Sequence, residues 1–335
     1  MQKSQQNTLS ANQDRGEIIL CRDTPEVRAE FNRSVLHPLQ LCQWGDFKEC
    51  TGHEIRRYKL HLPDSRTYYA QLIVVPEPAP FLYWPRGPLP DHQILALLQR
   101  IGKEEGACFV KIEPDSSFLI ISGQPNPKLD KHKKSLLRFG CRITEPYYAP
   151  FTCRIQLTKS LDELHASMKP KARYNISCAH RHGVTVREDN SPDAFEQYLH
   201  LRLMTMKRYG IRSHSLESHR KLWELMRKEG IAHLLITEYN GNVLAAWMLY
   251  RFRKTLHYPY GGSTRQNREV MPSYATMWEA IKFGKSCGCT IFDLWGCLGQ
   301  TPRVDDAWAG LHRFKMAFSP SIYEYLGAYD IPSKP

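Results

Sequence analysis

The feature that most constrains the fold is a hairpin signal in the second half of the chain. Asn240-Gly241 separates two runs rich in aliphatic and aromatic residues, Leu234–Tyr239 and Val243–Phe252. Asn-Gly accepts the positive φ angles of a two-residue type I′ turn, so these runs are predicted to pair as antiparallel strands. The segments that follow predict a third strand, a helix and a further strand, at Thr255–Tyr260, Ser273–Ser286 and Thr290–Leu294.

A weaker version of the same order appears in the first half. Strand-like runs at Glu54–Leu62, Tyr68–Val75 and Phe81–Trp84 precede a helix at about Asp91–Glu105 and a strand at Cys108–Ile112. A meander, a helix and another strand is the order of an acetyltransferase-like (GNAT) lobe. At 335 residues the chain has room for two such lobes. We therefore predict an α+β fold of two GNAT-like lobes with mixed, mostly antiparallel sheets.

The expected organisation is a disordered polar leader at residues 1–16, a first lobe at 17–150 and a second lobe at 151–317. A capping box at Ser160–Glu163 and the pair Ser191-Pro192 each predict the start of a helix in the second lobe. No apolar stretch approaches the roughly 18 residues that span a bilayer. The leader has no apolar core, which excludes a secretory signal, so we expect a cytoplasmic protein.

The charge balance points to a polyanionic partner. There are 46 Lys and Arg against 34 Asp and Glu, a formal charge of +12. Cations gain affinity for phosphates by releasing counterions. A solvated helix face is the simpler interpretation of either basic stretch taken alone; the two are Lys128, Lys131, Lys133, Lys134, Arg138 and Arg142, and Lys169, Lys171, Arg173, Arg181 and Arg187.

Metal and cofactor signals are weak. The ten cysteines form no C-x-x-C knuckle, and Cys178 with His182 is the one pair at helical ligand spacing, so no metal is expected. GNAT enzymes grip the pyrophosphate of coenzyme A with a glycine-rich turn before the helix. The equivalent stretch here, Arg265–Pro272, contains no glycine and includes Glu269. An acyl-coenzyme A donor is therefore not expected, and no cofactor is assigned.

Specific strings carry a family resemblance. Lys171–Ile176 followed by Ala179 and His182–Val184 resembles the Arg-Tyr-Asn-Ile…Ala…Gly-Val signature of the FemABX family of aminoacyl transferases. The match is ordered from about Leu36 to Asp330. Its other parts are Leu39-Gln40, Trp44–Lys48, Tyr83 with Arg86–Pro88, Lys111–Pro114, Phe292–Gly296 and Gly310–Lys315.

This resemblance implies transfer of an amino acid from aminoacyl-tRNA to the stem peptide of a peptidoglycan precursor, which forms the cell-wall cross-bridge. The acceptor is UDP-MurNAc-pentapeptide or lipid II, and a lipid-linked acceptor implies contact with the cytoplasmic membrane face. The first lobe is expected to bind the precursor and the second the aminoacyl-tRNA, while residues 318–335 return to the first lobe. Because no sustained heptad occurs, we expect a compact member without a coiled-coil arm. A monomer is expected, although the sequence carries no signal of oligomeric state.

The resemblance also assigns catalytic roles. Lys315 is the cation at the developing oxyanion, Phe314 shapes its surroundings, and Glu113 orients the acceptor amine and accepts its proton. Taken alone, Lys315 reads as an ordinary surface lysine. The chemistry requires no cysteine nucleophile, so Cys297 near His312 is set aside.

Substrate-binding roles are expected for residues of both lobes. Tyr258 and Tyr260 are equally compatible with core packing, and Asp293 with a buried acid that caps backbone N–H groups. Arg212 departs from the family pattern, because Ser218 and His219 stand where tyrosines are expected. The full expected set is Lys48, Trp44, Arg86, Arg212, Tyr258, Tyr260 and Asp293.

Arg173, Tyr174 and Asn175 are candidates for tRNA contact, with helix docking as the alternative. Two other functions remain open at this point. One is an ordinary acyl-coenzyme A N-acyltransferase, and the other is a basic tRNA-binding protein without enzymatic activity.

Overall fold

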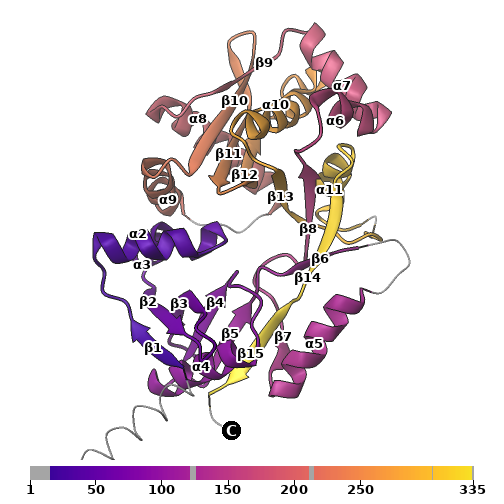
Figure 1. Ribbon diagram of the computed structural model, residues 1–335. Helices are drawn as coiled ribbons and strands as arrows, with labels where there is room; N and C mark the ends of the chain where they lie inside the picture. The colour runs from indigo at the N-terminus through magenta and orange to yellow at the C-terminus, as the bar shows by residue number, and fades with distance from the viewer. Residues whose placement is uncertain (1–15, 121–125, 211–214, 304, 334–335) are drawn as a thin grey trace, which may run out of the picture. The chain divides into compact units, whose positions relative to one another are not determined.

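The computed structural model describes residues 16–120, 126–210, 215–303 and 305–333. The chain divides into two compact units (Figure 1). One contains the described residues up to Tyr148 together with those from Tyr325 onward, and the other is Ala149–Glu324. Within the described ranges, no helix has both the length and the apolar character needed to cross a bilayer.

The first unit is built on a mixed sheet with the strand order β1-β2-β3-β4-β5-β15-β7. β4 and β5 run parallel, and the other neighbours in the sheet are antiparallel. The strands are β1 (Glu17–Leu20), β2 (Glu54–His61), β3 (Thr67–Val75), β4 (Phe81–Pro85), β5 (Phe109–Glu113), β7 (Arg142–Thr144) and β15 (Ala328–Pro332). The unit also contains β6 (Ser117–Leu119) and the helices α2 (Pro25–Ser34), α3 (Cys42–Cys50), α4 (His92–Glu104) and α5 (Pro127–Phe139).

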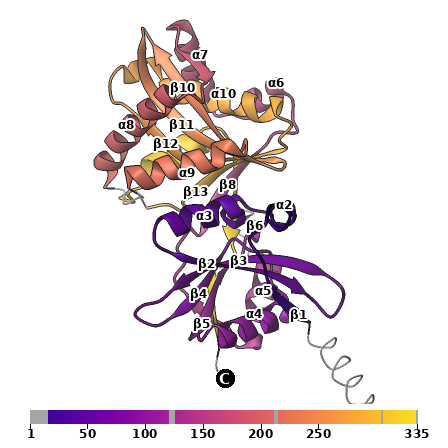
Figure 2. The same cartoon turned by 90° about the vertical axis from the view of Figure 1, so that its left-hand side faces the viewer.

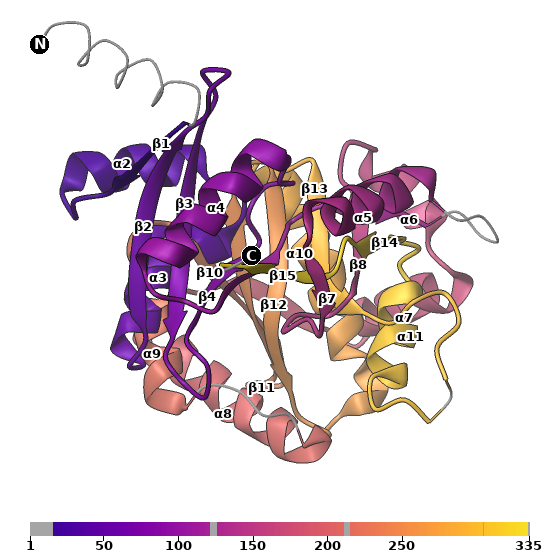
Figure 3. The same ribbon diagram turned by 90° about the horizontal axis from the view of Figure 1, so that it is seen from below.

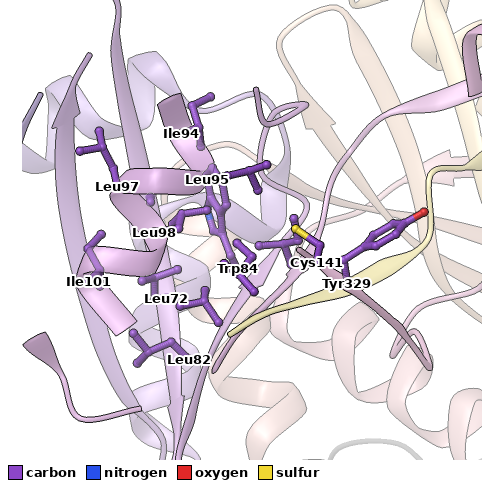
Figure 4. Close-up of a cluster of buried hydrophobic side chains, with 14 of the residues drawn as sticks. Leu72, Leu82, Trp84, Ile94, Leu95, Leu97, Leu98, Ile101, Cys141 and Tyr329 are labelled. Atoms are coloured by element: carbon purple, nitrogen blue, oxygen red, sulfur yellow. The ribbon is translucent and has the colours of Figure 1, made fainter. Parts of the chain in front are cut away.

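The core of this unit lies between the sheet and α4, the helix that connects the parallel strands (Figure 3). Asp91 caps α4 by accepting hydrogen bonds from the backbone N–H groups of Gln93 and Ile94. The apolar stripe of the helix, which includes Ile94 and Leu98, packs on Leu72, Leu82 and Trp84 of the strands (Figure 4). Burial of this stripe is the main force that holds α4 on the sheet.

The second unit repeats this plan. Its strands follow the order β14-β8-β13-β12-β11-β10-β9, with β12 and β13 parallel and the other neighbours antiparallel. The strands are β8 (Phe151–Gln156), β9 (Thr185–Glu188), β10 (Ala232–Tyr239), β11 (Asn242–Phe252), β12 (Thr255–Ser263), β13 (Ile291–Cys297) and β14 (Ser321–Tyr325). The helices are α6 (Leu161–Ser167), α7 (Pro170–Arg181), α8 (Pro192–Tyr209), α9 (Leu216–Lys228), α10 (Pro272–Ser286) and α11 (Ala309–Met316). α8 and α9 cover one face of β10–β12 (Figure 2), and α10 with α7 covers the other.

The strongest local predictions are confirmed. Asn240 and Gly241 have φ angles of 49° and 74°, and they connect the antiparallel pair β10–β11. Ser160 and Glu163 make both hydrogen bonds of the capping box at α6. Ser191 caps α8, whose C-cap residue Gly210 is left-handed. Local turn and cap chemistry therefore determines where these elements begin and end.

Other boundaries differ from the prediction. β12 continues to Ser263 and β13 to Cys297, beyond the predicted ends, because each pairs with a neighbouring strand on its other side. β14 pairs with β8, so the chain rejoins the first unit at Tyr325 rather than at residue 318. β15 then inserts between β5 and β7. β1, α2 and α3 were not predicted from the sequence, because their short segments show little periodicity.

A buried ion pair joins β8 to β13. Asp293 is 3 % exposed, and one of its oxygens lies 2.7 Å from Nε of Arg154. Thr152 donates its hydroxyl to the other carboxylate oxygen. Burial by itself would raise the pKa of Asp293, but Arg154, His257 and these hydrogen bonds outweigh it and lower the pKa below the usual value. The carboxylate is therefore charged inside the unit and fully partnered.

Replacing Asp293 by Asn should destabilise the protein, because Arg154 would lose its charged partner. We expect a loss of about 3 kcal/mol in the free energy of unfolding at pH 7, measured by urea denaturation. Since the folded-state pKa is lowered, the contribution of Asp293 is fully present above about pH 4 and is lost as the pH falls through the folded-state pKa. The difference in the free energy of unfolding between the variant and the unaltered protein should therefore be smaller at pH 3. Asp162→Asn, at an exposed position on α6, is the control and should change stability by less than about 1 kcal/mol; an equal effect of both variants would contradict this assignment.

Candidate active site

The candidate site lies where the two parallel strands of the second unit separate. β12 and β13 are paired only from Thr255 opposite Ile291 to His257 opposite Asp293. Past that point β12 continues beside β11 and β13 beside β8. The residues after the separation, including Tyr258 and Trp295, line a cavity of about 620 Å³. The divergence of the strands therefore opens the site.

The lining of this cavity is cationic and aromatic. Among the described residues that line it, none is Asp or Glu. Its cations are Arg202, Arg208, Arg265, Arg268 and Lys315, and its aromatic residues are Tyr209, Trp247, Tyr258, Tyr260, Tyr274, Trp295, Trp308 and Phe314. Cations attract phosphates, and aromatic faces stack with nucleobases. The cavity has the chemistry of a site for a nucleic-acid end.

Lys315 lies at the cavity on α11 and is 3 % exposed. Its Nζ donates to the carbonyl oxygens of Leu294 and Gly296, each at 2.7 Å. An ammonium group has three N–H donors, so one remains for a bound group. Burial lowers the pKa of Lys315, while the Cys153 and Cys297 thiols and Asp293 act in the opposite direction. Lys315 is thus not an ordinary surface lysine, the alternative for this residue taken alone, but a buried donor that two backbone carbonyl groups hold in place.

An unusual backbone conformation positions the two carbonyl groups that hold Lys315. Trp295, the residue between them, has a φ of 62°, which is rare for a residue with a large side chain. Its N–H donates to Asp293 at 2.8 Å, and its carbonyl oxygen accepts from the Thr152 hydroxyl at 3.1 Å. Asp293 does not line the cavity. These contacts favour the alternative interpretation of Asp293 as a buried acid that holds backbone groups, since it stabilises the strand bulge that presents the acceptors for Lys315. Contact of Asp293 with a substrate stays a prediction.

The tyrosines of β12 form one wall. The ring of Tyr258 stacks on Trp247 with centroids 4.0 Å apart, and Nζ of Lys315 lies 5.8 Å from the Tyr258 centroid. A Cβ at Gly261 would lie 2.3 Å from the Tyr258 hydroxyl oxygen, so only glycine allows this position. Tyr260 lies beneath the guanidinium of Arg202, and burial raises the pKa of Tyr260 to about 12. Both tyrosines line the cavity together with Phe314.

The N-terminus of α10 also lines the cavity. Met271, Pro272 and Ser273 line the cavity where this helix begins. A helix N-terminus carries partial positive charge, which favours anions. Arg265 and Arg268, both exposed, lie in the preceding segment. Arginine side chains therefore stand at the position where a coenzyme A enzyme would carry a glycine-rich turn.

The expected residues of the first unit form separate small groups. Lys48 on α3 lies over the rings of Trp44 and Phe47 at 5.5 and 5.6 Å, and burial lowers the pKa of Lys48. Arg86 is 7 % exposed, and its guanidinium lies 3.6 Å from the Tyr325 ring centroid. This guanidinium is therefore buried against an aromatic ring.

Glu113 is buried and holds the segment that follows β7. Its two carboxylate oxygens accept the backbone N–H groups of Tyr147 and Tyr148. Each oxygen keeps a further acceptor site, and the catalytic role expected for Glu113 stays a prediction. Arg212 lies outside the described residues.

The three tRNA candidates on α7 have different environments. Tyr174 is 62 % exposed, and the guanidinium of Arg181 lies over its ring at 5.8 Å. Asn175 is buried, and Arg173 donates to the backbone oxygens of Ala166 and Met168. Tyr174 is exposed, Arg173 is half-buried and Asn175 is buried, so Tyr174 is the most accessible of the three; contact with tRNA stays a prediction for all of them.

The Cys178–His182 pair does not form a metal site in the described part of the chain. Sγ of Cys178 lies 3.6 Å from Nδ1 of His182. Among the described residues, no group of three or more potential metal ligands includes this pair.

Sequence reasoning missed the arginines and two of the tryptophans of the cavity. Arg265 and Arg268 stood in the segment examined for a glycine-rich turn, so a test for positive charge there would have found them. Arg202 and Arg208 are six residues apart on α8, and their spacing gave no separate signal. Trp247 is remote from Lys315 in the sequence, whereas Trp308 is the N-cap residue of the helix that carries Lys315; both were missed because no motif marked them as lining residues.

Comparison with known proteins agrees with this arrangement. Residues 29–240 and 220–335 match the FemAB family. Lipid II:glycine glycyltransferase of Staphylococcus epidermidis is 20 % identical over 87 % of each chain.

Solved structures match the fold. A crystal structure of FemX superimposes with a TM-score of 0.78 at 20 % identity, covering 94 % of this chain and 97 % of that one. A tandem GNAT protein from the clavulanic acid biosynthesis pathway gives a TM-score of 0.53 at 9 % identity, covering 96 % and 99 %. The predicted α+β fold of two GNAT-like lobes is thus confirmed. The motifs, the fold and the family match lead to one conclusion: the chain belongs to the FemAB family.

Proposed function

We propose that this protein transfers an amino acid from aminoacyl-tRNA to an amine on the stem peptide of a peptidoglycan precursor. The observation that carries the proposal is the cavity around Lys315, in which four arginines and eight aromatic residues accompany the buried ammonium group and no carboxylate occurs among the described lining residues. Such a lining suits the 3′ end of a tRNA, whose phosphates need cations and whose bases need flat partners. The relatives named lipid II:glycine glycyltransferase favour glycine as the amino acid and lipid II as the acceptor; UDP-MurNAc-pentapeptide is the soluble alternative.

The reaction joins an amine to an ester carbonyl. A neutral amine attacks the aminoacyl ester, and the carbonyl oxygen becomes an oxyanion in the tetrahedral intermediate. The ester C–O bond then breaks, the tRNA hydroxyl leaves with a proton, and the proton lost by the amine returns to solvent. The remaining N–H of Lys315 stabilises the oxyanion, and Phe314 and Tyr258 exclude water around it. The two backbone carbonyl groups hold Nζ in place beforehand, so little reorganisation is needed.

The segment before α10 distinguishes this proposed enzyme from an acyl-coenzyme A transferase. Coenzyme A enzymes hold the pyrophosphate on backbone N–H groups of a glycine-rich turn, and residues 265–272 have none. The likeness to a tandem GNAT protein concerns the fold and not the donor. The reaction is proposed to take place in the cytoplasm, where aminoacyl-tRNA is present, with no cofactor besides this co-substrate.

Purified protein should transfer radiolabel from an aminoacyl-tRNA to the precursor. We expect labelled product with glycyl-tRNA and lipid II, measured by chromatography of the acceptor after incubation with each aminoacyl-tRNA in turn. UDP-MurNAc-pentapeptide is tested in parallel, and acetyl-coenzyme A serves as the competing donor. Folded protein that uses acetyl-coenzyme A but no aminoacyl-tRNA would overturn the proposal. Binding of tRNA without transfer, equally strong with and without the amino acid, would indicate a tRNA-binding protein.

Replacing Lys315 by Gln should lower kcat for this transfer by roughly 10²- to 10³-fold, because one donor to the oxyanion is lost. KM for the donor should change little, since the interaction strengthens only in the transition state. Arg313→Gln is the matched control: Arg313 lies on the same helix, is exposed, and does not line the cavity. Thermal unfolding of both variants checks the fold. A Lys315→Gln enzyme that folds and keeps its full kcat would exclude Lys315 from the reaction.

A further inference from the structure

The outer face of α5 in the first unit carries a row of cations that the proposed chemistry does not use. Lys131, Lys134 and Arg138 are spaced i, i+3 and i+7, which places them on one side of the helix. Leu129 and Leu136 are buried on the opposite side, in the core of the unit. Figure 1 shows α5 beside β7, the edge strand of the sheet, and the helix packs against β6 and β7.

The three cations of this row are exposed, and among the described residues none of them has an acidic partner. The helix contains five Lys and Arg residues and one acid, Asp130, so its net charge is 5 − 1 = +4. This face is therefore a local concentration of positive charge that attracts an external polyanion.

Exposed aliphatic side chains occur on α5 and on the two strands that it packs against. Leu137, on α5 itself, is 46 % exposed, and Ile143, on the adjoining strand β7, is 69 % exposed. Leu119 is 41 % exposed and lies on β6, the other strand that contacts α5. Aliphatic groups gain free energy by entering the acyl region of a lipid surface, and they offer no flat face for a base.

The basic helix of the second unit is different and points to the other class of polyanion. α7 exposes Tyr174 beside Arg181, an aromatic ring with a guanidinium over it. That pairing can stack with a base. Because α5 combines cations with aliphatic residues instead, its chemistry fits an anionic lipid surface better than RNA.

We propose that the outer face of α5, with Leu137 and Ile143 as apolar anchors, docks the protein on an anionic membrane surface. The proposal rests on the proposed function in one respect: a lipid-linked acceptor lies in the membrane, and docking brings the enzyme to it. Each cation near an anionic surface adds a modest attraction that salt screens, and short aliphatic anchors add the remainder. Neutral lipid alone therefore gives little binding.

Vesicle sedimentation of the full chain tests the docking surface directly. The probes are phosphatidylcholine vesicles and vesicles that contain phosphatidylglycerol in addition. We expect binding to the anionic vesicles only, weakened by salt. The triple variant K131E/K134E/R138E should bind them about 100-fold more weakly. Leu137→Ser should weaken binding by the same factor at low and at high salt. The control K221E/R227E/K228E reverses three exposed cations of α9 and should bind like the unaltered protein.

The outcomes separate this proposal from the proposed function, because sedimentation needs neither donor nor acceptor. Anionic-vesicle binding that is absent, or equal in the α5 and α9 variants, would overturn the docking surface. So would a triple variant that loses tRNA in a gel-shift assay but keeps its vesicle binding, which would assign α5 to RNA. Transfer to soluble UDP-MurNAc-pentapeptide should be unchanged in the triple variant, whereas transfer to lipid II in vesicles should fall. If the protein docks on vesicles but transfers no amino acid, the docking proposal stands and the proposed function is overturned.

Discussion

The site depends on one constraint, the burial of a lysine ammonium that must still be satisfied. Moving a charged group out of water is costly unless hydrogen bonds replace the lost hydration. Lys315 receives them from two carbonyl groups that flank Trp295, and those carbonyl groups converge only because Trp295 is left-handed. That conformation is in turn held by Asp293 and Thr152. The chain of dependence thus runs from a buried ion pair, through a strand bulge, to the group proposed to carry the chemistry.

The cavity follows from how two parallel strands diverge. β12 and β13 share three residue pairs and then separate, while β12 stays paired with β11 and β13 with β8, so the sheet opens at its centre. Past the separation, carbonyl groups of Leu294 and Gly296 on β13 accept hydrogen bonds from Lys315. The fold is shared with GNAT proteins, but function resides in the residues that line the opening. Arginines replace the glycine-rich turn here, and the N-terminus of α10 remains as a second source of positive potential. The same architecture can therefore accept a different phosphorylated donor.

Predictability from the sequence divides according to the range of the interactions. The Asn240-Gly241 turn, the Ser160 capping box and the Gly210 helix end are local, and each was predicted from neighbouring residues. Lys315 and Phe314 were assigned through an ordered family resemblance rather than through local chemistry. Local sequence does not decide the roles of Asp293 and Glu113, because an acid at the end of a strand looks the same whether it meets a substrate or caps backbone N–H groups. The structure adds the contacts of these two acids with the backbone N–H groups of Trp295, Tyr147 and Tyr148.

The sequence by itself determined the class of fold, the two-lobe plan and the family, because turns, caps, periodicity and motif order are properties of contiguous residues. It also determined the excess of positive charge, which composition alone expresses. The tertiary structure decided which cations face a cavity, which are buried in ion pairs and which stand on an outer helix face. It alone brought Lys315 within reach of carbonyl groups about twenty residues away in the chain. The physical reason is that burial and hydrogen-bond partnership depend on long-range packing, which no short stretch of sequence encodes.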